Sequence, residues 1–220
     1  MNEPISVKVV LLGESGVGKT SIINQFTANK FNPKCNTSVS AQFTSKSISF
    51  PESGKTIRFD IWDTVGQEKY RSLTKIFYKD AKIIILVYDI TTEYSFNELK
   101  EYWYNETLNN TDGAPLYAVC ANKYDLYQKA TVKDEDGKQF ADKINAIFQN
   151  TSAASNTGIN ILFEHLGKKI IDPEYDYKIM KSESDGFCKS INSKGFSIPF
   201  NLNLKGYGVL HISQLKLFIL

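Results

Sequence analysis

The chain has 220 residues, 42% of them hydrophobic, with 26 lysines and arginines against 24 aspartates and glutamates. This length allows one well-buried domain with residues to spare, and a net charge of +2 gives no general basic field for nucleic acid. The N-terminus does not resemble a signal peptide, and no apolar run reaches the roughly 20 residues of a membrane span. An odd number of widely spaced cysteines is typical of reduced thiols, so we expect a cytoplasmic protein: Cys35, Cys120 and Cys188.

The predicted elements alternate between strands and helices. In chain order the sequence predicts a strand at 7–12, a helix at 21–29, a hairpin of strands at 41–50 and 56–62, a strand at 82–90, a helix opening at Ser95, a strand at 116–122, and helices at 131–148 and 161–171. Ser95 and Glu98 have the spacing of a capping box. This order favours an α/β fold with a mostly parallel sheet.

The composition changes after Asp172. Residues 172–190 are polar and unpatterned, which is typical of a flexible linker, and residues 191–220 are apolar again. We therefore expect a folded domain over residues 1–171, a linker over 172–190 and an atypical apolar tail over 191–220.

GESGVGKT at residues 13–20 matches Gly-x-x-x-x-Gly-Lys-Thr and lies between a predicted strand and a predicted helix. The glycines let the backbone wrap phosphates with its N–H groups, and the helix adds its positive N-terminal end. Lys19 is expected to reach the β- and γ-phosphates, and the Thr20 hydroxyl is expected to bind Mg²⁺. The residues that we assign to the phosphate site are Ser15, Gly16, Val17, Gly18, Lys19, Thr20 and Ser21.

NKYD at residues 122–125 directly follows a predicted strand. One carboxylate can accept two parallel N–H bonds from guanine, whereas adenine has no ring N–H there, so Asp125 favours guanine. Asn122 is expected at the other edge of the base and the stem of Lys123 over its face. The motif disfavours an ATP-using enzyme such as a small-molecule kinase, for which the sequence also has no acceptor-site motif.

Over about residues 5–171 the chain resembles the Ras superfamily of small GTPases, and the Rab branch fits best. The resemblance is carried by the two motifs above, by SVSAQF at 38–43, by the segment 58–81 and by LVYDITTEYSF at 86–96. It implies the P-loop small GTPase fold, a six-stranded, mostly parallel sheet flanked by five helices, with GTP or GDP and Mg²⁺ as ligands. The small residue in AQF favours the endocytic Rab branch.

The resemblance also assigns residues around the γ-phosphate. Ser38 takes the place of the switch threonine that senses this phosphate and Mg²⁺, with Thr37 as the alternative. In DTVGQE at 63–68, Asp63 would hold Mg²⁺ through water, the Gly66 N–H would bond the γ-phosphate, and Gln67 would orient the attacking water.

Around the base, the resemblance places Phe31 edge-on to the guanine. The guanine-binding element appears as Ser152, Ala153 and Ala154, where the Ala153 N–H can bond the guanine carbonyl and Ala154 lacks the usual long stem. Asn156 replaces a customary glycine, and asparagine is the residue that best tolerates a positive φ in its place.

The resemblance implies an exchange factor, a GTPase-activating protein and effectors as partners, and cycling to the cytosolic face of endomembranes. Three aromatic residues match the surface by which Rab proteins bind effectors, although each also fits ordinary packing: Phe43, Trp62 and Phe77. Neither of the two arginines, Arg58 and Arg71, lies where an internal arginine finger would be. We therefore expect slow GTP hydrolysis, with the missing charge supplied in trans.

Several positions depart from the family pattern. Val65 replaces an alanine, and its stiff β-branched side chain predicts a hindered switch. Together with Ser38 and Ala154 it keeps open a second interpretation, a nucleotide-binding switch module with impaired hydrolysis.

The carboxyl end also departs from the Rab pattern. Cys188 lies too far inside the chain for prenylation, so the usual membrane anchor is not predicted. Residues 191–220 are then either a membrane- or partner-binding tail or an error of gene prediction.

Overall fold

A computed structural model of the chain describes residues 3–33, 42–63 and 79–178. The chain divides into two compact units, Met1–Tyr177 and Lys178–Leu220, and almost all described residues belong to the first. In the described part of the chain, no helix is both long enough and apolar enough to cross a bilayer.

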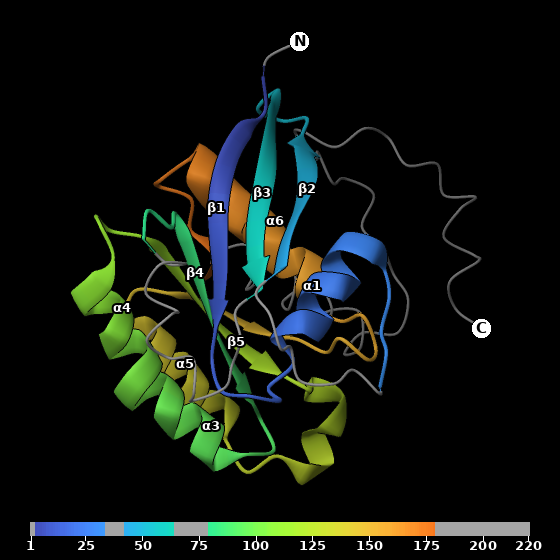
Figure 1. Ribbon diagram of the computed structural model, residues 1–220, viewed down its shortest axis with the longest axis vertical. Coiled ribbons are helices and arrows are strands. Elements are labelled where there is room, and N and C mark those ends of the chain that lie inside the picture. The colour runs from blue at the N-terminus through green and yellow to red at the C-terminus, as the bar shows by residue number, and fades with distance from the viewer. Residues whose placement is uncertain (1–2, 34–41, 64–78, 179–220) are drawn as a thin grey trace, which may run out of the picture. The chain divides into compact units, whose positions relative to one another are not determined.

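The first unit is built on a six-stranded sheet with the order β2-β3-β1-β4-β5-β6 (Figure 1). The strands are β1 Ile5–Leu12, β2 Gln42–Phe50, β3 Lys55–Asp63, β4 Ile83–Asp89, β5 Leu116–Asn122 and β6 Ile147–Asn150. Only the β2–β3 pair is antiparallel among these strands, as the predicted hairpin requires. The predicted mostly parallel sheet is therefore confirmed.

Helices cover both faces of this sheet. The helical segments are α1 Lys19–Ala28, α3 Glu93–Glu98, a π-helical turn Leu99–Trp103, α4 Tyr104–Asn110, a 3₁₀ segment Tyr124–Lys129, α5 Asp134–Lys143 and α6 Ile159–Ile171. The segments α3, Leu99–Trp103 and α4 follow one another without a break, and we call them helix 93–110. Together with the sheet they give the predicted P-loop small GTPase fold.

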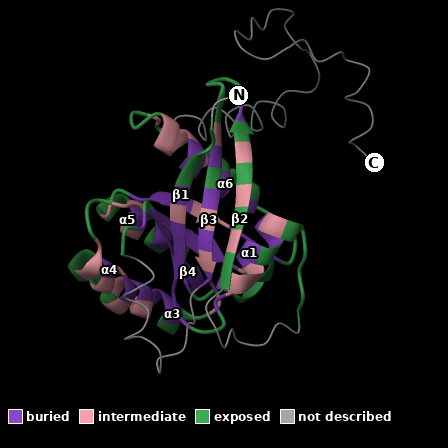
Figure 2. Cartoon of the chain, turned by 45° about the horizontal axis from the view of Figure 1, so that its top comes forward, coloured by how far each residue is buried: buried purple, intermediate pink, exposed green. Residues whose placement is uncertain are grey.

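The core lies in two layers, one on each face of the sheet. On one face α1 and α6 pack together, with the rings of Phe26 and Phe163 stacked at 3.6 Å between centroids. On the other face helix 93–110 and α5 pack against β4 and β5. Every residue of β4 is buried, as expected for a parallel strand covered on both faces. In Figure 2 the buried residues accordingly concentrate in the central strands.

The predicted helix at 131–148 is wrong at its carboxyl end. The helix α5 stops at Lys143, and Asn145 has a left-handed φ of 52°. Ile147 and Phe148 then pair in parallel with Ala118 and Val119 and are buried. Burial in the sheet thus overrides the helical pattern of this segment.

The predicted capping box is also wrong. The helix begins at Glu93, after Thr92, so Ser95 lies inside its first turn. The Ser95 hydroxyl donates to the Thr92 carbonyl at 2.7 Å and accepts the Asp89 N–H at 3.1 Å. It therefore ties the helix to the end of β4 instead of capping the helix.

The chain continues to pack against the domain after α6. The Tyr175 hydroxyl lies 2.6 Å from His165 Nδ1, and the Tyr177 hydroxyl accepts the Phe148 N–H at 3.1 Å. These residues belong to the segment 172–190, which we expected to be a linker. The boundary between linker and tail falls outside the described residues and stays a prediction.

Candidate functional site

The residues predicted to bind nucleotide gather at the carboxyl edge of the parallel strands. The loop 13–18 follows β1, Asp63 ends β3 and Asn122 ends β5. Ser152 and Ala153 lie just after β6. This edge is where open α/β sheets bind their ligands, because the loops after neighbouring strands meet there.

Glycines shape the loop that follows β1. Gly13 and Gly18 have φ values of 146° and 100°, a region that favours glycine. A Cβ on Gly13 would lie 2.1 Å from the Val87 carbonyl oxygen, and one on Gly18 would lie 2.4 Å from Asn122 Nδ2. At Gly13 and Gly18 the loop therefore packs against the ends of β4 and β5 so closely that neither position has room for a side chain. Gly18 is also the N-cap of α1, so the loop leads directly into the N–H groups of that helix.

Lys19 is a buried cation at the start of α1. Its Nζ donates to the carbonyl oxygens of Gly13 at 2.7 Å and Glu14 at 2.8 Å. Burial lowers the pKa of Lys19 to about 8, although the charges of Asp63 and Glu14 act in the opposite direction. An ammonium held this way is a strong counter-charge for a phosphate group.

Thr20 and Asp63 provide oxygen ligands beside this cation. The Thr20 hydroxyl donates to Asp63 Oδ2 at 2.6 Å, and Asp63 is buried at the end of β3. Hydroxyl and carboxylate oxygens are the ligands that Mg²⁺ prefers, so this pair fits the predicted ion. Within residues 3–33, 42–63 and 79–178, no group of three or more His, Cys, Asp or Glu side chains is placed to hold a metal.

The remaining residues predicted around the γ-phosphate fall outside the described residues, and their roles stay predictions. They are Ser38, Val65, Gly66 and Gln67.

Asn122 connects three elements through its buried side chain. Its Nδ2 donates to the Val17 carbonyl at 2.7 Å, and its Oδ1 accepts the Thr151 hydroxyl at 3.1 Å. The amide thus joins β5 to the phosphate loop and to the residue after β6. The expected contact with the base stays a prediction, but this bracing role is a property of the fold itself.

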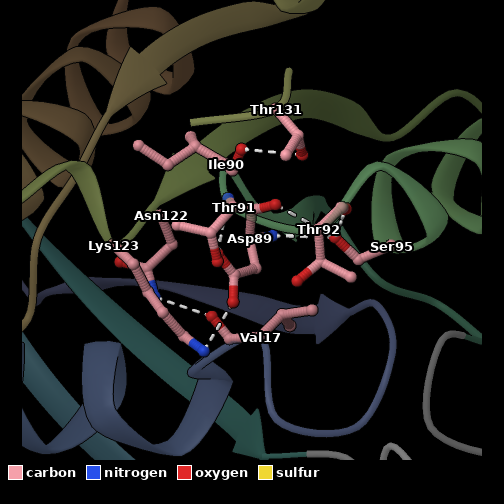
Figure 3. A network of polar contacts seen from close by, with 9 residues as sticks. All are labelled: Val17, Asp89, Ile90, Thr91, Thr92, Ser95, Asn122, Lys123 and Thr131. Atoms are coloured by element: carbon pink, nitrogen blue, oxygen red, sulfur yellow. Dashed lines mark hydrogen bonds and ion pairs between the residues drawn. The ribbon is translucent and has the colours of Figure 1, made fainter. Parts of the chain in front are cut away.

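Lys123 is held by a carboxylate that the sequence reasoning missed (Figure 3). Its Nζ lies 2.6 Å from Asp89 Oδ2, and Asp89 Oδ1 accepts the N–H and the hydroxyl of Thr91 at 2.8 and 2.7 Å. Lys123 also has a left-handed φ of 63°. The ion pair therefore holds the lysine at the end of β4. An acidic residue at the end of the buried run KIIILVYDI was the available signal for Asp89.

Asp125 is paired with the loop after β6. The Ser152 hydroxyl donates to Asp125 Oδ1 at 2.5 Å and accepts the Ser155 N–H at 3.0 Å. The main chains of Ser152 and Thr157 pair at 2.9 and 3.0 Å, which closes the loop. Asn156 has a φ of 54°, as predicted for the residue in place of a glycine. The structure therefore brings the two predicted base-binding segments together.

The other residues predicted near the base differ in exposure. Ala153 is buried, while Ala154 and Phe31 are exposed. Their contacts with a base stay predictions.

Two of the three predicted effector-binding aromatic residues lie side by side. Phe43 and Trp62 face each other across β2 and β3, with ring centroids 5.2 Å apart, and Phe43 is 56% exposed. Phe77 falls outside the described residues.

Comparison with known proteins gives one consistent result. A model of the Ras family matches residues 8–172. Rab-22A of Mus musculus is 38% identical over 164 residues, which are 74% of this chain and 83% of that protein. Rab-21 of Bos taurus is 40% identical over 167 residues (76% and 74%), and RabJ of Dictyostelium discoideum is 38% identical over 173 residues (77% and 66%).

Proposed function

Because the chain belongs to the Rab family of Ras-related small GTPases, we propose that it is a GTP/GDP switch that hydrolyses GTP slowly and regulates vesicle traffic at the cytosolic face of endomembranes. The observation that carries this proposal is the group formed by Lys19, Thr20 and Asp63. Lys19 is a buried cation at the start of α1. Beside it, the Thr20 hydroxyl and Asp63 Oδ2 at the end of β3 are two oxygen ligands 2.6 Å apart.

Each member of this group has a defined task toward a bound nucleotide. Lys19 would bind the β- and γ-phosphates, and the Thr20 hydroxyl and the Asp63 carboxylate would hold Mg²⁺. Bound Mg²⁺ neutralises charge on the phosphate oxygens. By the family resemblance, Ser38 and the Gly66 N–H approach the γ-phosphate.

Specificity for guanine is assigned to the segments 122–125 and 152–154. Asp125 accepts two N–H bonds from guanine while Ser152 holds its carboxylate, which supports selection against adenine. The stem of Lys123, fixed by Asp89, covers one face of the base. Ala154 is exposed and short, so the opposite face is covered less than in the family pattern.

We expect the slow rate because neither arginine lies at the position in the sequence where an internal arginine finger would be. Arg58 forms an ion pair with Asp60 at 3.0 Å on β3, and Arg71 is the other arginine of the chain. A GTPase-activating protein would supply the missing charge in trans. An exchange factor and effectors complete the expected partners, and Phe43 with Trp62 is the proposed effector surface.

A second function is a nucleotide-binding module with impaired hydrolysis. It is favoured by three substitutions relative to the family pattern, at Ser38, Val65 and Ala154. A stiff valine beside the glycine that must approach the γ-phosphate would slow the switch without removing any nucleotide contact.

Single-turnover hydrolysis of bound GTP separates the two functions. We expect a rate on the order of 10⁻⁴ s⁻¹ for the wild type and at least a tenfold lower rate for Gln67→Leu, because leucine cannot orient the attacking water. Both proteins should retain GDP. Equal, negligible rates would identify the binding module, and rapid turnover by the purified wild type would contradict the slow intrinsic rate.

A further inference from the structure

A hydrogen bond between buried side chains ties the phosphate loop to helix 93–110. The Trp103 indole Nε1–H donates to Glu14 Oε1 at 3.0 Å. The two side chains come from positions 89 residues apart, and both residues are at most 5% exposed. A hydrogen bond to a charged, buried acceptor is stronger than a neutral one, so this contact fixes both partners.

Glu14 also touches the cation of the phosphate site. Its main-chain carbonyl accepts Lys19 Nζ at 2.8 Å, while its carboxylate binds Trp103. One residue therefore carries a bond to the phosphate-binding lysine on its main chain and a bond to a distant helix on its side chain. A shift of Trp103 would move the peptide that holds Lys19.

The helix presents Trp103 from an unusual turn. The Tyr104 N–H bonds the Leu99 carbonyl, five residues back, so the turn 99–103 is π-helical. Leu99, Trp103 and Thr107 are all buried at a spacing of four residues. Four residues of an α-helix rotate by about 400°, some 40° past a full turn, whereas a π turn rotates less per residue. The π turn thus helps to keep all three side chains on the sheet-facing side of the helix.

We propose that Trp103 is a positioning residue for the phosphate loop, acting through Glu14, and that the π turn 99–103 is the structural device that places it there. This inference rests on the proposed function, because its consequence is the rate of nucleotide release. When the indole bond is lost, the peptide at Glu14 is less restrained, Lys19 is held less firmly, and GDP leaves faster.

The competing explanation is that Trp103 only fills the core. Trp103→Phe retains most of the apolar contact but removes the N–H donor, so it tests the hydrogen bond more than the packing. Tyr117→Phe is a matched control, because Tyr117 lies on β5 and its hydroxyl bonds Thr107 of the same helix. It removes the buried hydrogen bond of 2.9 Å between the Tyr117 and Thr107 hydroxyls, which has no contact with the phosphate loop.

The experiment measures the release of a fluorescent GDP analogue from the full chain, together with the unfolding temperature of each variant. We expect Trp103→Phe and Glu14→Ala to release GDP about three- to tenfold faster than the wild type. The double variant should be no faster than the faster single variant, because both changes remove the same bond. Tyr117→Phe should lower the unfolding temperature while changing the release rate less than about twofold.

The proposal is overturned if Trp103→Phe releases GDP at the wild-type rate, or if Tyr117→Phe accelerates release equally. If Trp103→Phe does not fold, Glu14→Ala with an unchanged release rate overturns it in the same way. A wild-type chain that holds no GDP would refute the proposed function, and the inference with it. If the wild type and Trp103→Phe both release GDP at the same slow rate, the inference is refuted while the proposed function stands.

Discussion

Lys19 has to remain buried and charged in a protein that must also accept a triphosphate. Burial lowers its pKa to about 8 from 10.5, because the charged form loses its hydration. Below pH 8 the lysine is protonated in the folded and the unfolded chain, and its buried charge reduces stability. As the pH rises from about 8 towards 10.5, the folded chain releases this proton before the unfolded chain does. The contribution of Lys19 to the free energy of unfolding therefore increases with pH over this range.

Binding should reverse this shift. Phosphates beside Lys19 favour its charged form, so we expect GDP binding at pH 8 to take up roughly half a proton, and uptake should increase between pH 7 and 8. Titration calorimetry of the nucleotide-free protein in two buffers with different ionisation enthalpies measures this number. An uptake that is the same at pH 7 and pH 8 would contradict the assignment to Lys19.

Sequence reasoning located individual site residues better than their partners. The motifs placed Asn122, Asp125 and Ser152 at one site, and the structure brings these residues together. The motifs could not show that Val17 accepts the Asn122 amide or that Asp89 holds Lys123. Val17 lies in the phosphate loop and Asp89 at the end of β4, and their distance in the chain leaves no pattern in a single sequence.

Among the elements, the loop after β1 has tight steric limits at some positions and none at others. Gly13 and Gly16 both have positive φ values, 146° and 79°, but only Gly13 faces a backbone atom within van der Waals distance. Gly16 has open space where a Cβ would be. A side chain at Gly16 would therefore cause backbone strain only, whereas a side chain at Gly13 would also cause a steric clash.

Alanine at each position should show this difference. We expect Gly16→Ala to reduce the free energy of unfolding by about 1–2 kcal/mol through strain alone. Gly13→Ala should cost about 3 kcal/mol or more, since its Cβ would lie 2.1 Å from the Val87 carbonyl oxygen. Urea unfolding of both variants tests the prediction, and equal losses would show that the loop can move away from β4.

The elements that were predicted wrongly share a cause. The segment 144–148 has apolar spacing that continues a helix, yet the strand β6 begins at Ile147 because pairing with β5 buries Ile147 and Phe148. Ser95 has capping-box spacing, yet it bonds to the end of β4. In both cases a contact distant in sequence outweighs a local preference.

For the whole molecule, alternation of apolar runs with helical patterns was enough to predict the α/β class and the parallel sheet. The family resemblance added the six-stranded sheet, and the structure agrees. The end of the folded domain was harder to predict, because residues 172–177 are polar. Tyr175 and Tyr177 nevertheless pack against α6 and the start of β6.

Truncation measures how much this last segment contributes. The free energy of unfolding of a chain that ends after Ile171 should be about 2 kcal/mol lower than that of a chain that ends after Lys178. The shorter chain loses two aromatic contacts and their hydrogen bonds. The longer chain with Tyr175→Phe and Tyr177→Phe should lose about half as much, since the rings remain. Identical urea midpoints for the two truncated chains would show that residues 172–178 do not stabilise the domain.

Both tryptophans of the chain lie next to residues of the proposed phosphate site. Trp62 immediately precedes Asp63 at the end of β3, and Trp103 donates to Glu14 in the phosphate loop. Indole emission depends on polarity and hydrogen bonding, so the buried ring of Trp103 and the partly exposed ring of Trp62 will emit at different wavelengths. The unlabelled protein therefore carries two optical probes of its own nucleotide state, one next to Asp63 and one bonded to Glu14.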